Sequence, residues 1–273
     1  MSLSTIENIN IIGFGRMGKS MLRGWLNNQL DKEVVRIVDP FIDDKDPFLI
    51  NHNLKLYDMD KIRLDDGIVL IAVKPQVAGD LFDKLKEMIS ENTVIISIIA
   101  GYSVADMRKY LGPKPTIIRT MPNTPAAIGR GITALFSEHN LPQDLISKVE
   151  SLFGSMGEFF WVENETDMHA ITAISGSGPA YYYLFTECLS AIAVKHGLKK
   201  ELADILSTQT FIGSSALMEN SPNIGVVEHR ENVTSPGGTT EAALKIFMNN
   251  DKLKLLIDEA VGMAIERSKS LSK

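Results

Sequence analysis

Two glycine-rich segments contain residues whose types and spacing could bind negatively charged ligands. In the first, GFGRMG, Gly13, Gly15 and Gly18 have the G-x-G-x-x-G spacing, after an apolar run and before a helix-like segment at 17–30. Gly13 permits a tight turn, Gly15 lets the backbone approach a pyrophosphate, and Gly18 allows close packing of the helix on the strand. The helix N-terminus then presents N–H groups to phosphates. The segment therefore predicts dinucleotide binding rather than only a structural turn.

The acidic residue expected about 20 positions after such a loop is Asp39, at the end of VVRIVD. A carboxylate there can accept hydrogen bonds from the adenosine ribose and repel a 2′-phosphate, and Asp43 and Asp44 would add to that repulsion. Arg16 could instead attract a 2′-phosphate, and Asp39 before Pro40 is also an ordinary turn former. Charge alone therefore favours NADH over NADPH, but only weakly.

The second segment, NVTSPGGTTEAAL, interrupts a region that otherwise has helical spacing. A turn of glycines that leads into a helix can present several backbone N–H groups in one direction, and the helix dipole favours a negative group there. Ser235, Thr239 and Thr240 can add hydroxyl donors. The pattern fits a pocket for a small carboxylate. The alternative is a plain helix–helix connection with serine and threonine caps.

The elements that must position the first segment alternate between strand and helix. Five apolar runs, INIIGF, VVRIVDP, GIVLIAVKP, TVIISIIAG and TIIRTMPNTP, are separated in several places by helix-like segments such as 77–89. Continuous apolar strands between helices indicate a parallel sheet that is covered on both faces. We therefore expect a doubly wound, Rossmann-type α/β domain over residues 1–162.

The periodicity changes after about residue 163, and the rest of the chain has helical spacing. A helix expected at 179–196 is apolar around most of its circumference, so it must be buried on several sides. The remaining residues are too few to surround it, which predicts a subunit interface. We expect an all-α domain over residues 163–273, with GEFFWVENET as the only evident linker before it.

The composition excludes several classes of protein. The net charge of −6 gives no electrostatic reason to expect nucleic acid or an anionic membrane as partner. The single cysteine, Cys188, leaves no internal disulfide and is typical of a reducing compartment. No apolar run approaches the roughly 20 residues of a membrane-spanning helix, and the N-terminus lacks a signal-peptide pattern. We expect a soluble, cytoplasmic protein. The five histidines have no metal-ligand spacing, so we expect no metal.

Five motifs in order resemble the pyrroline-5-carboxylate reductase family: GFGRMG, AVKPQ, MPNTPAAIGRG, ISGSGPAYYY and NVTSPGGTT. The resemblance runs from Ile9 to about Ser268. It implies a Rossmann-type N-terminal domain and a helical C-terminal domain that interleaves with a second copy, giving a homodimer. In the family such dimers often assemble further into rings. It also implies reduction of 1-pyrroline-5-carboxylate to L-proline with NADPH or NADH.

The resemblance also implies a role for each matching residue. The substrate carboxylate would bind at Ser235, Gly237, Gly238 and Thr239, and the catalytic Thr240 would lie near the ring nitrogen. The cofactor would contact the glycine loop, the end of the second strand, the AVKP segment and the asparagine of MPNTP. These are Gly13, Phe14, Gly15, Arg16, Met17, Gly18, Asp39, Ala72, Val73, Lys74, Pro75 and Asn123.

Some assignments stay open at this point. Lys74 could be a catalytic acid, but pairing with Glu219 in a structural role is the better interpretation. The asparagine that the family places near the adenosine ribose has Met59 at the closest position, so that contact is not carried over. Alternative functions are a non-catalytic dinucleotide sensor, a reductase of another cyclic imino acid, and a β-hydroxyacid dehydrogenase. The last would need a lysine early in the 179–196 helix, where the first lysine is Lys195.

Overall fold

The structure, a computed structural model, describes residues 3–271 and divides the chain into two compact units. The first unit contains residues 1–177 together with 264–273, and the helical unit contains residues 178–263. The expected boundary after residue 162 stays a prediction. It differs from this division, which keeps 163–177 and the C-terminal segment with the first unit.

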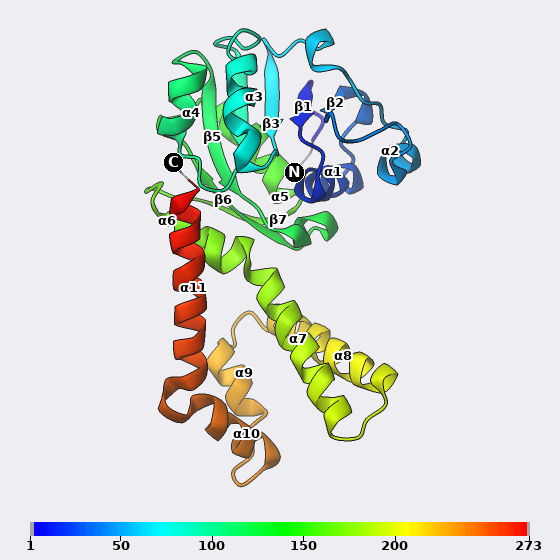
Figure 1. Cartoon of the computed structure of the whole chain (residues 1–273), viewed down its shortest axis with the longest axis vertical. Coiled ribbons are helices and arrows are strands. Elements are labelled where there is room, and N and C mark those ends of the chain that lie inside the picture. The colour runs from blue at the N-terminus through cyan, green and yellow to red at the C-terminus, as the bar shows by residue number, and fades with distance from the viewer. Residues whose placement is uncertain (1–2, 272–273) are drawn as a thin grey trace. The chain divides into compact units, whose positions relative to one another are not determined.

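The first unit is built on one seven-stranded sheet in the order β2-β1-β3-β4-β5-β6-β7 (Figure 1). Neighbouring strands are parallel except β5 and β6, which are antiparallel. The order reverses direction at β1 and β3, the point where open α/β sheets bind ligands. The strands are β1 (Ile9–Ile12), β2 (Val35–Val38), β3 (Gly67–Ile71), β4 (Thr93–Ser97), β5 (Thr116–Met121), β6 (Gly131–Phe136) and β7 (Gly157–Trp161).

Helices cover both faces of this sheet. Successive strand residues point to opposite faces, and both sets are apolar. One core cluster joins α1 (Arg16–Asn27) and α5 (Gln143–Gly154) to one face. A second cluster joins α3 (Ala78–Leu85) and α4 (Val104–Leu111) to the other face. The short helix α2 (Pro47–His52) packs against the first cluster through Phe48 and Leu49. The expected doubly wound α/β domain is confirmed.

The last two strands differ from the sequence prediction. The segment interpreted as a linker, GEFFWVENET, forms β7 over its first five residues, and β6 was not anticipated. In β7 the burial alternates between half-buried and exposed residues because it lies at the sheet edge. Its apolar run, Phe159 to Val162, is short and lies between Glu158 and Glu163, so it is a weaker signal than the runs of the buried parallel strands. After it come α6 (Asp167–Ile171) and a π-helical turn at Thr172–Gly176.

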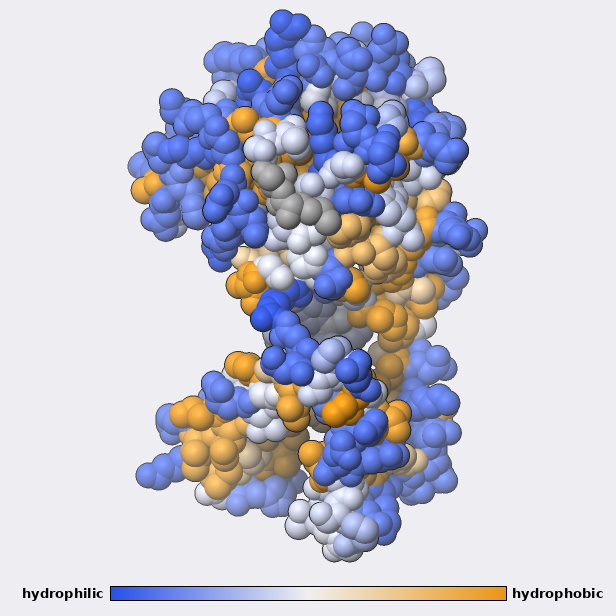
Figure 2. All heavy atoms as spheres, turned by 180° about the vertical axis from the view of Figure 1, so that it is seen from behind, coloured by the Kyte–Doolittle hydropathy of each residue, from blue (hydrophilic) through white to orange (hydrophobic). Residues whose placement is uncertain are grey.

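The helical unit contains α7 (Gly178–Lys195), α8 (Lys200–Glu219), α9 (Val226–Asn232) and α10 (Thr239–Met248). It also contains most of α11 (Lys252–Ser270), which continues into the first unit. The helix expected at 179–196 is thus present as α7, with bounds shifted by one residue. Its apolar side chains and those of α8 are largely exposed, and Figure 2 shows part of this surface in orange. Among the described residues, no helix is both long and apolar enough to cross a membrane.

The C-terminal segment of α11 packs within the first unit. The Nδ1 atom of His169 lies 3.0 Å from the Ser268 hydroxyl, and Leu271 packs against the backbone of Gly101. Nearby, the buried guanidinium of Arg119 pairs with Glu165 at 2.9 Å. Burial, together with the positive charges of Arg119 and Lys269, lowers the pKa of His169 below its ordinary value of 6.5. We expect this histidine to be neutral at physiological pH.

Candidate active site

The glycine loop after β1 has the geometry that its three glycines were expected to provide. Gly13 has φ +91°, and a Cβ there would lie 2.7 Å from the carbonyl carbon and oxygen of Ala72. A Cβ on Gly18 would lie 2.7 Å from the carbonyl oxygen of Gly13, so only glycine permits this close packing of α1. Around Gly15 there is no atom within 4 Å of a Cβ. The loop therefore leaves room beside its exposed backbone, as a pyrophosphate requires.

Two backbone hydrogen bonds place this loop at the carboxyl edge of the sheet. The Gly13 N–H donates to the Val38 carbonyl at 2.9 Å, at the end of β2. The Ala72 N–H donates to the Ile12 carbonyl at 2.8 Å, just after β3. The loop thus sits between the ends of β2 and β3, at the reversal of strand order. Helix α1 starts at Arg16, within the motif, with Gly15 as its N-cap, and its first-turn N–H groups have no helical acceptors.

The other residues of the loop divide between core and surface. The Phe14 ring is fully buried and packs edge-on against Phe48, with ring centroids 5.4 Å apart. Met17 is partly buried against the same core, whereas Arg16 is exposed. Of these three expected contacts, only Arg16 therefore offers an exposed side chain to a ligand. Phe14 and Met17 can contribute mainly through the backbone.

Asp39 bridges the glycine loop and the turn after β2. Its Oδ2 atom accepts a hydrogen bond from the Phe14 N–H at 2.6 Å, and its Oδ1 atom accepts one from the Phe41 N–H at 2.9 Å. The carboxylate therefore has the structural role that a turn-forming aspartate would have. Because each carboxylate oxygen can accept more than one hydrogen bond, this role leaves it able to accept ribose hydroxyls. The Phe41 side chain beside it is 90% exposed.

Two further segments expected at the cofactor lie after β3 and β5. Ala72 and Val73 follow β3, and the exposed Lys74 begins a short 3₁₀ helix that has Pro75 as its first residue. Asn123 is buried after β5, where its Oδ1 atom accepts from the Ile132 N–H at 3.0 Å. Its amide nitrogen donates to the Ser175 carbonyl at 3.3 Å. Asn123 thus has a structural role, since it holds two backbone segments in place. Its expected contact with the cofactor stays a prediction.

In the helical unit, the SPGG turn lies between α9 and α10. Gly237 has φ +72°, in the left-handed region that favours glycine, and its N–H donates to the Oε2 atom of Glu241 at 2.8 Å. The Gly238 N–H donates to the Ser235 carbonyl at 3.0 Å. Both glycine N–H groups are therefore satisfied within the turn. This narrows the expected set of donors, because these two N–H groups were expected to face a ligand.

The donors that remain come from the first turn of α10. Thr239 and Thr240 are its first two residues, and an α-helix gives the N–H groups of its first turn no acceptor of its own. The hydroxyls of both threonines and of Ser235 lie on the same short segment. The positive end of the helix dipole is at this point as well. The segment can therefore bind a small carboxylate through amides and hydroxyls.

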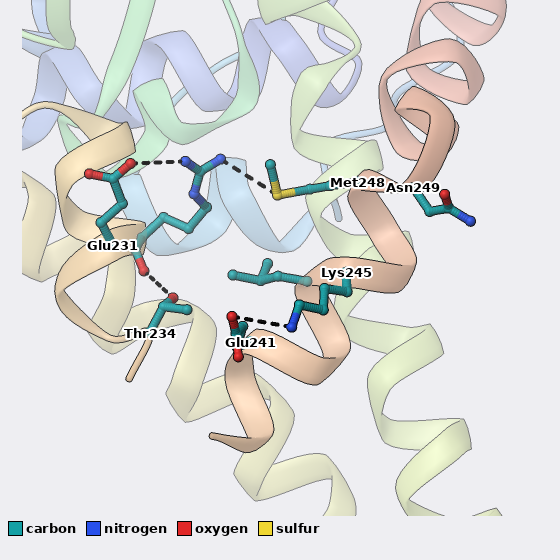
Figure 3. A pocket seen from close by; sticks show the side chains of 8 residues that line it. Glu231, Thr234, Glu241, Lys245, Met248 and Asn249 are labelled. Carbon is teal, nitrogen blue, oxygen red and sulfur yellow. Dashed lines mark hydrogen bonds and ion pairs between the residues drawn. The ribbon is translucent and has the colours of Figure 1, made fainter. Parts of the chain in front are cut away.

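A cavity of about 400 Å³ lies beside this turn, between α9 and α10 (Figure 3). Glu241 pairs across one helical turn with Lys245 at 3.2 Å. The hydrogen bond from Gly237 and the nearby Lys245 lower the pKa of Glu241, which is therefore ionised at neutral pH. The residues that line the cavity are Arg230, Glu231, Thr234, Glu241, Leu244, Lys245, Met248 and Asn249.

Sequence reasoning missed Glu241, although a signal for it was present. Gly238 is the N-cap of α10, and Glu241 is the third residue of the helix. A glutamate at that position commonly reaches back to a backbone N–H before the helix. The spacing G-T-T-E therefore indicated a contact of this kind, with the N-cap Gly238 as the expected donor, whereas the donor in the structure is Gly237. Within residues 3–271, no group of three or more histidine, cysteine, aspartate or glutamate side chains could hold a metal ion.

Comparison with known proteins gives two family models and many similar chains. Residues 165–271 match the model described as pyrroline-5-carboxylate reductase dimerisation. Residues 8–101 match the model described as NADP oxidoreductase, coenzyme F420-dependent. The pyrroline-5-carboxylate reductase of Haemophilus influenzae is 32% identical over 264 residues, which are 96% of this chain and 97% of that protein.

Solved structures agree with this similarity over the whole chain. A pyrroline-5-carboxylate reductase from Coxiella burnetii is 33% identical, with a TM-score of 0.87 over 98% of this chain and 99% of that one. A pyrroline carboxylate reductase from Plasmodium falciparum, solved with NADP bound, is 31% identical, with a TM-score of 0.86 over 98% and 100%. With motifs, fold and full-length similarity in agreement, the chain belongs to the pyrroline-5-carboxylate reductase family.

Proposed function

We propose that this chain reduces the C=N bond of 1-pyrroline-5-carboxylate to give L-proline, with NADPH or NADH as the reductant. The observation that carries the proposal is that this chain, a member of the family, has two segments suited to binding the two ligands. One is a glycine loop with room for a pyrophosphate, and the other is a helix start with hydroxyls and amides for a carboxylate. The NADP-bound relative supports a nicotinamide dinucleotide as cofactor.

The cofactor would be held by the carboxyl edge of the sheet. The backbone of Gly13, Gly15 and Gly18 and the start of α1 would bind the pyrophosphate. Asp39 would accept the ribose hydroxyls, and the AVKP segment with Asn123 would border the nicotinamide end. When bound, the reduced nicotinamide supplies the hydride, and the protein supplies orientation and electrostatics.

The substrate carboxylate would bind at the start of α10. The amides of Thr239 and Thr240, the Ser235 hydroxyl and the helix dipole would hold it, while Gly237 and Gly238 shape the turn. Fixing the carboxylate orients the ring, and such orientation can supply a large share of the rate. Because a protonated imine is already an electrophile, this chemistry requires no protein nucleophile.

Thr240 is the proposed catalytic residue because its hydroxyl can hydrogen-bond the ring nitrogen, directly or through water. It would keep the proton on that nitrogen while the neighbouring carbon is reduced. General acid assistance of this kind contributes about 10²- to 10⁴-fold in rate. For Lys74 we propose the supporting role, paired with Glu219, rather than proton transfer.

The exposed apolar surface of the helical unit and the dimerisation model support a homodimer as the working form. A higher ring of dimers and a cytoplasmic location remain proposals from the sequence.

The proposal is tested by following absorbance at 340 nm with purified protein, 1-pyrroline-5-carboxylate, and NADH or NADPH in separate runs. Turnover with either cofactor is the expected result. Thr240→Ala should lower kcat by about 10²-fold and leave cofactor affinity unchanged. The control is Thr166→Ala, an exposed threonine without a side-chain capping bond at the start of α6. Tight cofactor binding without turnover in the wild type would reject the reaction.

Cofactor preference is tested with Asp39→Ser. Loss of the carboxylate should raise the ratio of kcat/KM with NADPH to that with NADH by about tenfold, which corresponds to about 1.4 kcal/mol. An unchanged ratio would reject its role in discrimination. If kcat/KM also falls equally with both cofactors, Asp39 only holds the Phe14 and Phe41 amides.

A further inference from the structure

The conformation of the SPGG turn depends on a side chain that follows it in the sequence. Glu241 folds back over the first turn of α10, and its Oε2 atom accepts the Gly237 N–H at 2.8 Å. Gly237 is in the left-handed region, at φ +72°. In the same turn, the Gly238 N–H donates to the Ser235 carbonyl at 3.0 Å. These two hydrogen bonds close the turn from both sides.

The charge of Glu241 would by itself oppose a substrate carboxylate at the same helix start. Its neighbour Lys245, one helical turn further on, lies 3.2 Å from Oε1 (Figure 3). This leaves Oε2 for Gly237 and Oε1 for Lys245, so one carboxylate makes both contacts. The lysine offsets the negative charge close to where it arises. Together, Glu241 and Lys245 hold the Gly237 N–H in place and carry little net charge. We call the hydrogen bond between Glu241 and Gly237 the clamp.

We propose that Glu241 is a positioning residue that holds the SPGG turn in shape, with Lys245 offsetting its charge. In this arrangement the turn directs the amides of Thr239 and Thr240 towards the substrate carboxylate. The inference rests on the proposed function, because it takes the start of α10 as the substrate site. It adds a residue to that site which does not touch the substrate and acts through Gly237.

The opposite possibility is that Glu241 occupies the place of the substrate carboxylate and must leave before the substrate binds. The two ideas predict opposite changes in KM when Glu241 is removed. A clamp that is lost leaves a loose turn and a higher KM. A competing carboxylate that is lost leaves an open site and a lower KM.

The experiment compares Glu241→Ala and Glu241→Gln in the full-length protein. Loss of a cap lowers the equilibrium constant for the capped helix start by about 2- to 30-fold, and substrate binding that depends on this start should weaken by up to that factor. Glu241→Ala should raise the KM for 1-pyrroline-5-carboxylate by that factor, with kcat and cofactor affinity within about twofold. Glu241→Gln keeps an acceptor for Gly237 and should restore KM to within about threefold of the wild type. A KM for Glu241→Ala that is unchanged or lower overturns the proposal.

A second readout does not depend on turnover. Hydrogen exchange of a peptide that covers 233–241, measured by mass spectrometry, should speed up in Glu241→Ala and return towards wild type in Glu241→Gln. Unchanged exchange in Glu241→Ala would also overturn the proposal. The matched control is Glu266→Ala, which removes an ordinary ion pair of a helix, with Lys269 at 2.9 Å. Wild-type protein without turnover would reject the proposed reaction, while the exchange result would still judge the clamp.

Discussion

The two units differ in the burial of their apolar side chains. Among the described residues, every buried apolar core residue lies in the first unit except Ala203. In the helical unit, large apolar side chains of α7 and α8 are exposed, among them Leu184 at 58% and Ile205 at 60%. A single protomer thus has a complete core in one unit and an incomplete one in the other. Exposed apolar area of this extent marks an interface.

The difference indicates where each unit obtains its stability. The sheet of the first unit is covered by its own helices, so it can fold around its own core. Helix α7 is apolar around most of its circumference and packs on α8 within the chain. Much of its apolar surface is exposed in a single chain, and residues 165–271 match the dimerisation model. Interfaces of this obligate kind resemble a domain core divided in two.

The largest effect is expected from placing charges on the exposed face of the helical unit. In Leu184→Asp/Ile205→Asp, each lost side chain removes about 1.5–3 kcal/mol of burial. A two-fold symmetric dimer counts each loss twice. We expect a monomer at micromolar concentration and loss of turnover, with NADH still bound by the first unit. Light scattering coupled to size exclusion measures the mass, and fluorescence titration measures NADH binding.

The control is Ile50→Asp in α2 of the first unit, where the side chain is 62% exposed. It should leave mass and turnover as they are. A dimer that persists in the double variant would show that the exposed faces of α7 and α8 are not the interface.

A smaller effect, confined to the first unit, is expected at the glycine loop. Gly13→Ala forces a Cβ to 2.7 Å from the Ala72 carbonyl at a positive φ and should lower the free energy of unfolding by about 1–3 kcal/mol. Gly15→Ala meets no atom within 4 Å and should cost less than about 1 kcal/mol. Both should weaken cofactor binding. Urea unfolding and NADH titration check this, and equal losses of stability would contradict the assigned roles.

The smallest effect concerns the end of α11 that belongs to the first unit. Because burial lowers the pKa of His169, the unfolded chain takes up its proton more readily than the folded protein. This contribution is fully present above the unfolded pKa of about 6.5 and is lost as the pH falls through it towards the lower folded value. In His169→Gln, the midpoint of urea unfolding should depend less on pH between about 5 and 7. An identical pH dependence in wild type and variant would contradict this contribution of His169.

The fold was predictable wherever burial left a regular pattern. The first five strands lie in the sequence as apolar runs because the sheet buries them on both faces. The edge strand β7 was interpreted as a linker because Glu158 and Phe160 are exposed while their neighbours are half-buried. Its apolar run, Phe159 to Val162, has only four residues between two glutamates and does not alternate, so its pattern does not identify a strand.

The site was predictable to the level of motifs but not of contacts. The glycine spacing gave the correct roles to Gly13 and Gly18, because close backbone packing leaves no alternative to glycine. The hydrogen bonds of Asp39 could not be predicted from the sequence. Its bond with the Phe14 N–H forms only when β2 lies beside the glycine loop, and its other bond is with the Phe41 N–H. For Gly237, the pattern indicated an open amide, whereas Glu241 satisfies it.

The sequence by itself determined the class of each unit, and it predicted two ligand-binding segments and a partner copy. These depend on local chemistry and on patterns of apolar residues, which are read along the chain. Only the tertiary structure decided which amides of the glycine loop remain for a ligand, because the hydrogen bond of Phe14 with Asp39 joins residues far apart in sequence. It also decided that the last residues of α11 pack with the first unit, where His169 and Ser268 meet across 3.0 Å.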